Sequence, residues 1–69
     1  MENINDFLLK DNYCELYNSS GTIGETRLKI YFRDYIDLLY KVDCIAEVAP
    51  NYLYSIRQLK KYIYEVKRH

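Results

Sequence analysis

The residues able to do chemistry are few in this 69-residue chain. Its single histidine is His69, the last residue, where we do not expect a positioned general base. Cys14 and Cys44 are far apart and form none of the CxxC, HxxxH or EF-hand spacings of a metal site. Gly21 and Gly24 fit neither phosphate-binding loop pattern. The sequence therefore predicts no metal, no cofactor and no enzymatic activity.

The N-terminal segment and the cysteines together indicate a compartment. Residues 1–10 are acidic and lack the basic start and apolar centre of a signal peptide. No apolar stretch approaches the roughly 20 residues that a membrane span needs. One cysteine pair without a secretory signal usually means two reduced thiols. We therefore expect a cytoplasmic protein with free Cys14 and Cys44, the latter as a small half-buried apolar residue.

Charge and tyrosine are unevenly distributed. Ten Lys and Arg balance ten Asp and Glu over the whole chain, but residues 1–25 are mainly acidic and residues 51–69 mainly basic. Nine residues are tyrosine, more than so small a chain can bury, and exposed tyrosines favour binding interfaces. We predict that a partner binds a face made of acidic and tyrosine side chains, namely Asp6, Asp11, Tyr13, Glu15, Tyr17 and Glu25.

Local patterns predict a single α+β domain over residues 1–69. Apolar residues at helical spacing indicate a short amphipathic helix over residues 2–10. Apolar and polar residues alternate over residues 13–17 and 26–32, and the loop between these segments holds both glycines. This arrangement predicts a two-stranded β-hairpin after the first helix.

The C-terminal half predicts a helical hairpin. An apolar stripe at steps of three and four residues indicates a helix over residues 34–48, and Pro50 ends it by restricting the backbone of Ala49. A second stripe indicates a final helix. Either Asn51 as N-cap or a Ser55–Gln58 capping box would start it. The residues of this second stripe are Tyr52, Ile56, Leu59, Ile63 and Val66.

An all-α alternative remains open from the sequence. The apolar stripe of the first long helix extends backwards through Leu28 and Phe32, and a Thr22–Glu25 capping box would start one helix over residues 23–49. Such a helix would be about 40 Å long, more than this chain can cover on one side. We favour a strand over residues 26–32 for that reason.

The first third of the chain resembles a known family. The resemblance lies in the segment Asn3-Ile4-Asn5-Asp6-Phe7-Leu8, then in residues 12–17, and, after the polar loop, in residues 28–32. These segments are similar to the opening of a small phage anti-CRISPR protein that inhibits the type II CRISPR nuclease. The resemblance implies a helix, a β-hairpin and C-terminal helices. It also implies inhibition without catalysis, by an acidic DNA mimic that occupies the site reading the protospacer-adjacent motif.

Three hypotheses about function follow. The first is a phage-encoded, protein-binding inhibitor that occupies the nucleic-acid-binding surface of a host CRISPR effector or other nuclease. The second is a helix-turn-helix regulator whose final helix brings Arg57, Gln58, Lys60 and Lys61 to DNA. The third is a structural or assembly protein that forms a homodimer through its tyrosine-rich surface. None of the three involves a membrane.

Overall fold

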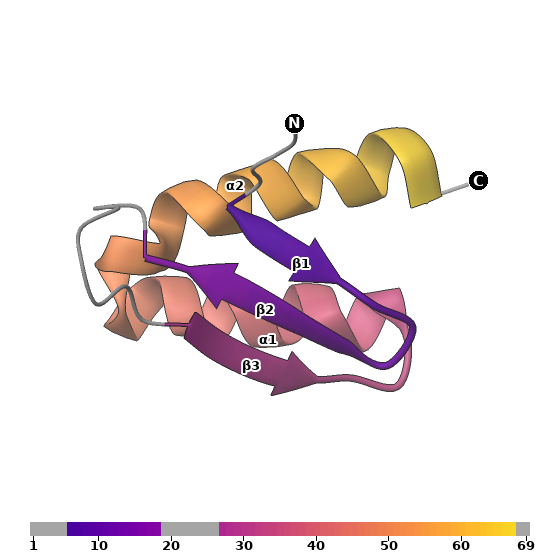
Figure 1. Ribbon diagram of the computed structural model, residues 1–69, viewed down its shortest axis with the longest axis horizontal. Helices are drawn as coiled ribbons and strands as arrows, with labels where there is room; N and C mark the ends of the chain where they lie inside the picture. The colour runs from indigo at the N-terminus through magenta and orange to yellow at the C-terminus, as the bar shows by residue number, and fades with distance from the viewer. Residues whose placement is uncertain (1–5, 19–26, 68–69) are drawn as a thin grey trace.

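The computed structural model describes residues 6–18 and 27–67. A three-stranded sheet is followed by two helices (Figure 1), so the fold class is α+β, as predicted. The elements are β1 Phe7–Leu9, β2 Tyr13–Tyr17, β3 Arg27–Tyr31, α1 Tyr35–Val48 and α2 Leu53–Tyr62. A 3₁₀ turn over Pro50–Tyr52 precedes α2, and a π-helical turn over Ile63–Lys67 continues it.

The sheet is antiparallel, with β2 in the centre between β1 and β3. Tyr13 lies opposite Tyr31, and Leu16 opposite Leu28, which confirms the predicted pairing of residues 13–17 with the segment that follows the glycine loop. On the other side, a two-residue turn connects β1 to β2. It is closed by the backbone N–H of Lys10, which donates to the carbonyl of Tyr13 at 2.9 Å.

The helix predicted over residues 2–10 is wrong in the part that the structure describes. Phe7–Leu9 form strand β1, in which Leu8 lies opposite Glu15, while residues 2–5 lie outside the described residues. The ring of Phe7 instead packs against Tyr62 of α2, with 5.8 Å between the ring centroids. Because so short a helix is marginal alone, strand pairing and this contact outweigh the helical spacing.

The long-helix alternative over residues 23–49 is also wrong, because Arg27–Tyr31 pair with β2 as a strand. Its supposed capping box, Thr22–Glu25, lies outside the described residues. A strand is favoured here because its alternate residues are covered by the helices, whereas a helix would leave the neighbouring strand β2 with one partner fewer.

Helix α1 confirms the helix predicted over residues 34–48. Its N-cap is Asp34, whose carboxylate accepts from the backbone N–H of Asp37 at 2.8 Å. Asp37 in turn accepts from the backbone N–H of Arg33 at 3.0 Å, so the two carboxylates bond one backbone N–H before the helix and one within its first turn. The helix ends at Val48, and Ala49, with φ of −138° and ψ of 74°, lies outside the helical region, which Pro50 disfavours for the residue before it.

The final helix is confirmed, although it does not start as predicted. Asn51 lies within the 3₁₀ turn, α2 begins at Leu53, and the N-cap residue of α2 is Tyr52, whose side chain forms no capping hydrogen bond. Ser55 forms no capping box with Gln58. It is fully buried, and its hydroxyl donates to the backbone carbonyl of Tyr17 at 2.5 Å, which connects α2 to the end of β2.

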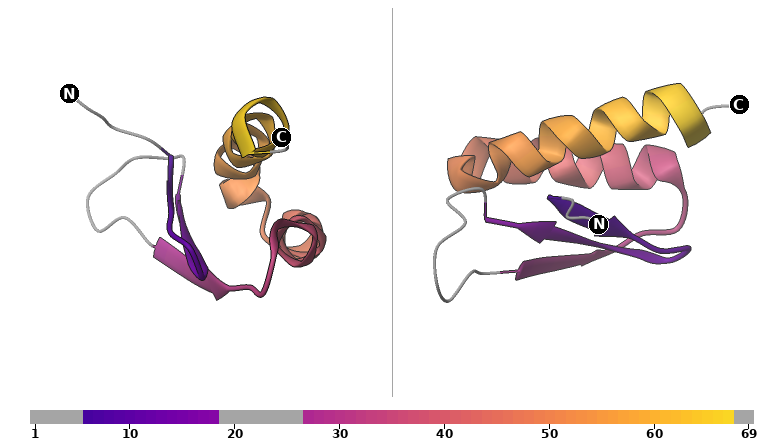
Figure 2. Two further views of the ribbon diagram at one scale, coloured as in Figure 1. Left: turned by 90° about the vertical axis from the view of Figure 1, so that its right-hand side faces the viewer. Right: turned by 45° about the horizontal axis from the view of Figure 1, so that its top comes forward.

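Both helices lie on one face of the sheet (Figure 2), and the core fills the space between these layers. The apolar stripes supply it as predicted, except that Val66 is 54% exposed. Val66 lies in the π-helical turn, whose wider winding shifts it out of line with Ile63. The buried core residues are Cys14, Leu16, Ile30, Phe32, Leu38, Val42, Tyr52, Ile56, Leu59 and Ile63.

One polar junction connects β3 to α1. The ammonium of Lys41 donates to the backbone carbonyl of Tyr31 at 2.7 Å and lies 3.2 Å from a carboxylate oxygen of Asp37. The hydrogen bond from the backbone of Arg33, together with Lys41, lowers the pKa of Asp37. The charged form of Asp37 thus stabilises both the start of α1 and its attachment to the sheet.

We expect acid to weaken this junction. A folded-state pKa below the ordinary 3.8 means that the unfolded chain takes up the proton first, so the stabilisation is present above that value and is lost as pH falls below it. The thermal midpoint of the parent should therefore drop more steeply than that of Asp37→Asn between about pH 5 and pH 2. Glu47→Gln, at an exposed position of the same helix, is the matched control and should follow the parent.

Two adjacent leucines of α1 test the core. Leu38 is fully buried, whereas Leu39 is half-buried at its edge. Leu38→Ala should cost about 2–5 kcal/mol of unfolding free energy, enough to unfold much of so small a domain, and Leu39→Ala markedly less. Urea unfolding of the two variants measures the difference. Equal losses would show that α1 does not present Leu38 to the sheet.

Candidate functional site

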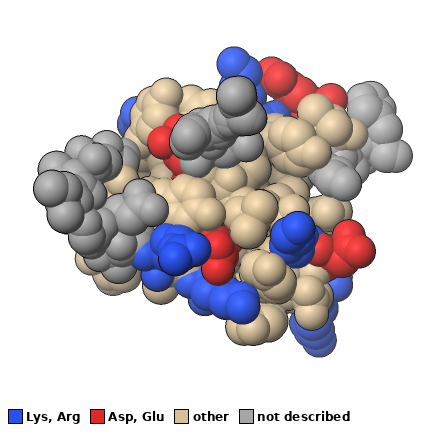
Figure 3. Space-filling view, in the orientation of Figure 1, with Lys and Arg blue, Asp and Glu red and all other residues tan. Residues whose placement is uncertain are grey.

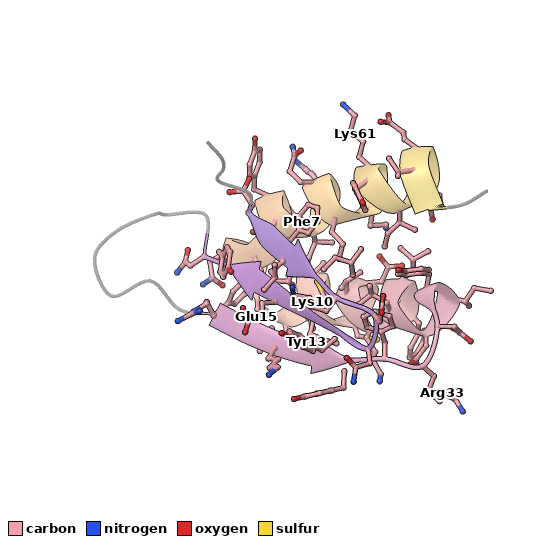
Figure 4. All side chains as sticks on the ribbon, turned by 45° about the vertical axis from the view of Figure 1, so that its right-hand side comes forward. Phe7, Lys10, Tyr13, Glu15, Arg33 and Lys61 are labelled. Atoms are coloured by element: carbon pink, nitrogen blue, oxygen red, sulfur yellow. The ribbon has the colours of Figure 1, made fainter. Side chains whose placement is uncertain are left out.

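The face of the sheet opposite the helices carries the tyrosine and charged side chains of β2 and β3, together with Leu8 of β1; we call it the open face. Along β2, Cys14 and Leu16 point to the helices, so the residues on either side of each point the other way. Figure 4 shows Tyr13 and Glu15 on this side. The open face consists of Leu8, Tyr13, Glu15, Tyr17, Arg27, Lys29 and Tyr31.

One half of the open face is an aromatic pair with a cation over it. The rings of Tyr13 and Tyr31, opposite each other on β2 and β3, have centroids 5.8 Å apart. The ammonium of Lys29 lies 4.2 Å from the Tyr13 centroid and 5.3 Å from that of Tyr31. A side-chain hydrogen bond with Tyr31 raises the pKa of Lys29, which keeps the ammonium over the two rings charged.

The other half of the open face is organised around a carboxylate. Glu15, in the middle of β2, lies 3.9 Å from the guanidinium of Arg27 and accepts a hydrogen bond of 3.4 Å from the hydroxyl of Tyr17. Burial first, and then the negative charge of Glu15, raise the pKa of Tyr17, so its hydroxyl stays protonated as a donor. This half therefore offers a hydroxyl, a carboxylate and a guanidinium within one small area.

The structure brings together three of the six residues predicted for the binding face: Tyr13, Glu15 and Tyr17. Asp6 lies immediately before β1, where its carbonyl accepts from the backbone N–H of Tyr17 at 3.0 Å, and Asp11 is exposed in the turn before Tyr13. Glu25 lies outside the described residues. The first five thus lie on or beside the open face.

Sequence reasoning missed the contribution of β3 to this face. Arg27, Lys29 and Tyr31 were the polar half of an alternating segment, and the alternation was the signal that could have placed them. What the pattern did not give was the register that sets Lys29 beside Tyr13. The prediction therefore counted the acidic side chains and left out the basic ones that lie between them.

The charges of the open face are mixed. Figure 3, which views this face, shows Lys and Arg side chains next to Asp and Glu side chains, with uncharged surface between them. Glu15 faces Arg27, and Lys29 lies beside it across the strands. Over the described residues, the open face does not form the continuous negative surface that an acidic DNA mimic requires.

The basic side chains of α2 lie elsewhere. Lys60 forms a salt bridge of 2.7 Å with Asp43 of α1, Arg57 and Lys61 are exposed, and Lys61 projects away from the sheet in Figure 4. The left view of Figure 2 shows α1 nearly end-on and α2 inclined to it, and the two helices are in contact.

In comparisons with known proteins, the chain matches no protein-family model, no curated protein and no solved structure. Within residues 6–18 and 27–67, no group of three or more His, Cys, Asp and Glu side chains is arranged to hold a metal ion. Nor does this part of the chain contain a helix with the length and apolar character for crossing a membrane. His69 lies outside the described residues.

The two thiols are free but occupy opposite environments. Cys14 is fully buried beneath the open face, and burial, assisted by the charge of Glu15, raises its pKa to about 12. Cys44 is exposed on α1, so the prediction that it is half-buried is wrong. Cys44 lies on α1 outside the buried stripe that passes through Leu38 and Val42.

We expect one fast thiol in the folded protein. At pH 7, Cys44 should react at once with a thiol reagent. Cys14 is excluded from water and its thiol stays protonated because the pH lies far below its pKa, so it should react only on unfolding. Cys44→Ala should abolish the fast phase and Cys14→Ala should leave it unchanged. Two fast thiols would contradict the burial of Cys14, and the absence of any free thiol after unfolding would reveal a disulfide.

Proposed function

We propose that this protein acts without catalysis, by binding another protein through the open face. The observation that carries this proposal is the concentration of three tyrosines, a carboxylate and two cations on one side of a paired sheet. Tyr31 is 58% exposed although it is a large aromatic side chain. Exposed tyrosines on rigid backbone provide contact area and a hydroxyl at low entropic cost, which is typical of the residues that dominate protein interfaces.

The distribution of charge supports a protein as partner. A nucleic acid is bound mainly through its phosphates, and this requires cations that are free of carboxylates. Here Arg27 lies 3.9 Å from Glu15, and Lys29 lies over two tyrosine rings. A face with both signs of charge next to aromatic surface complements another protein surface, where opposite charges fix orientation.

The resemblance of residues 3–32 to an anti-CRISPR protein suggests the class of partner. A phage-encoded inhibitor of this kind would cover the nucleic-acid-binding surface of a host CRISPR effector, whose Lys and Arg would meet Glu15, Asp6 and Asp11. The tyrosine hydroxyls would then bind the same groove. In this proposal the inhibitor competes with the nucleic acid for its site and changes no covalent bond.

The binding face is tested with two exposed tyrosines on different elements. Tyr31→Ala should weaken binding to a guide-loaded type II CRISPR nuclease at least tenfold, because it removes the aromatic partner of Tyr13 at the centre of the interface. Tyr40→Ala is the matched control, since Tyr40 is 70% exposed on α1, and should bind within about twofold of the parent. Titration calorimetry and inhibition of DNA cleavage give the two readouts.

A charge reversal is a second test of the binding face, and Glu15 is not a suitable position for it. Glu15→Lys would place a like charge directly opposite Lys29 and weaken the sheet itself. Asp11→Lys, in an exposed turn, should leave the fold intact and reduce binding to the nuclease. If the parent binds no nuclease but retards random duplex DNA, and Lys61→Glu abolishes that, the helix-turn-helix hypothesis replaces this proposal.

A further inference from the structure

The outer edge of β1 has backbone groups that point away from the sheet. Between β1 and β2, Lys10 donates to Tyr13 at 2.9 Å and Tyr17 donates to Asp6 at 3.0 Å. Hydrogen-bonded and non-bonded pairs alternate along an antiparallel pair of strands, so Leu8 is bonded to β2 and its two neighbours are not. The N–H and C=O groups of Phe7 and Leu9 therefore point outward, in the direction where a further strand would lie.

A groove with apolar side chains in its lining lies beside this edge. Phe7, Leu8, Leu9 and Tyr62 line a hollow between β1 and α2, with the Phe7 side chain directed towards α2 (Figure 4). In the described part of the chain, no backbone hydrogen bond from this side reaches Phe7 or Leu9. A short apolar edge strand with outward backbone groups is a site for strand addition.

We propose that a second copy of this chain occupies this edge. In this arrangement β1 pairs with β1 of the second copy, antiparallel, about a two-fold axis at Leu8. Phe7 then exchanges backbone hydrogen bonds with Leu9 of the second copy, and Leu9 with its Phe7. The two three-stranded sheets become one continuous sheet.

The side chains of β1 select both the occupant and the register. Pairing about Leu8 sets Asp6 opposite Lys10 of the second copy, and Lys10 opposite its Asp6, in non-bonded pairs whose side chains approach most closely. The two neighbouring registers that also bond the outward groups, centred on Phe7 or on Leu9, bring Asp6 and Lys10 opposite other residues. The edge is thus complementary to itself in one register.

The dimer also has a geometric consequence for the open face. Leu8 lies on the side of the sheet that carries Tyr13 and Glu15, and the two-residue repeat assigns its flanking residues Asp6 and Lys10, which bond to β2 in the same way, to that side as well. A two-fold axis perpendicular to the sheet keeps the open faces of both copies on the same side. The homodimer would therefore present one continuous surface with two equivalent sets of tyrosines, whether or not its partner is the one proposed above.

Amide hydrogen exchange tests the pairing at the residues that form it. As the protein concentration is raised to about 1 mM, exchange of the Phe7 and Leu9 amides should slow at least tenfold. The Leu8 amide, already bonded to β2, is the internal control and should not change with concentration. Over the same range the mass in solution should rise from 8.4 kDa towards twice that value.

Charge exchange provides a test that a merely structural effect does not reproduce. Asp6→Lys and Lys10→Asp each oppose like charges across the two-fold axis, so each variant alone should dimerise at least tenfold more weakly than the parent. Mixing the two variants restores both opposite-charge pairs and should give a heterodimer, seen by native mass spectrometry with one variant isotopically labelled.

Several results would overturn this proposal. One is a parent that stays at 8.4 kDa at about 1 mM with unprotected Phe7 and Leu9 amides, which would leave the edge to a strand of a different protein. Another is a dimer in which those amides remain unprotected, since it would use another surface. A third is a mixture of the two variants that forms no heterodimer. None of these results depends on the CRISPR nuclease, so they are independent of the test of the open face.

Discussion

The strict alternation of side chains along β2 is the constraint on which the rest of this structure depends. Cys14 and Leu16 are fully buried beneath the helices, so the residues between and beside them are forced onto the other face. A slip of one residue in the strand register would bury Glu15 in the apolar core and expose Leu16 to water, and both changes would destabilise the fold. The hydrogen bond from Ser55 to the Tyr17 carbonyl fixes the same strand to α2. The strand register therefore determines both which residues form the core and which form the open face.

The small size of the chain explains why the open face exists at all. Two helices are enough to cover one side of a three-stranded sheet, and the described chain places both of them there. The side chains on the other side must tolerate water and still favour strands, which tyrosine, lysine and arginine do. The residue types that tolerate exposure to water on this face, above all tyrosine and arginine, are also residue types that are frequent in protein interfaces. The exposed tyrosines of the sheet thus have a structural cause, whatever partner they bind.

Within residues 6–18 and 27–67, oppositely charged side chains pair locally and do not separate into an acidic and a basic pole. The acidic N-terminal part and the basic C-terminal part suggested separate surfaces, one for a protein and one for a nucleic acid. In the fold, however, Glu15 meets Arg27, Asp43 meets Lys60, and Asp37 meets Lys41. Each pair joins or caps neighbouring elements, and the surfaces that remain carry both signs. Mixed surfaces discriminate partners by the arrangement of charges, whereas a net field attracts any molecule of opposite sign.

The sequence by itself determined the features that are encoded locally. Helix α1 has its apolar stripe and its stop at Pro50 within one segment, and Tyr13, Glu15 and Tyr17 share a face in any strand because of the two-residue repeat. Only the tertiary structure decided the features that need contacts between distant segments. Phe7–Leu9 form a strand because they pair with β2 and because Phe7 packs against Tyr62. Lys29 lies over the ring of Tyr13 because of the register in which β3 pairs with β2. Such pairings gain their free energy from residues far along the chain, and a local pattern contains no record of them.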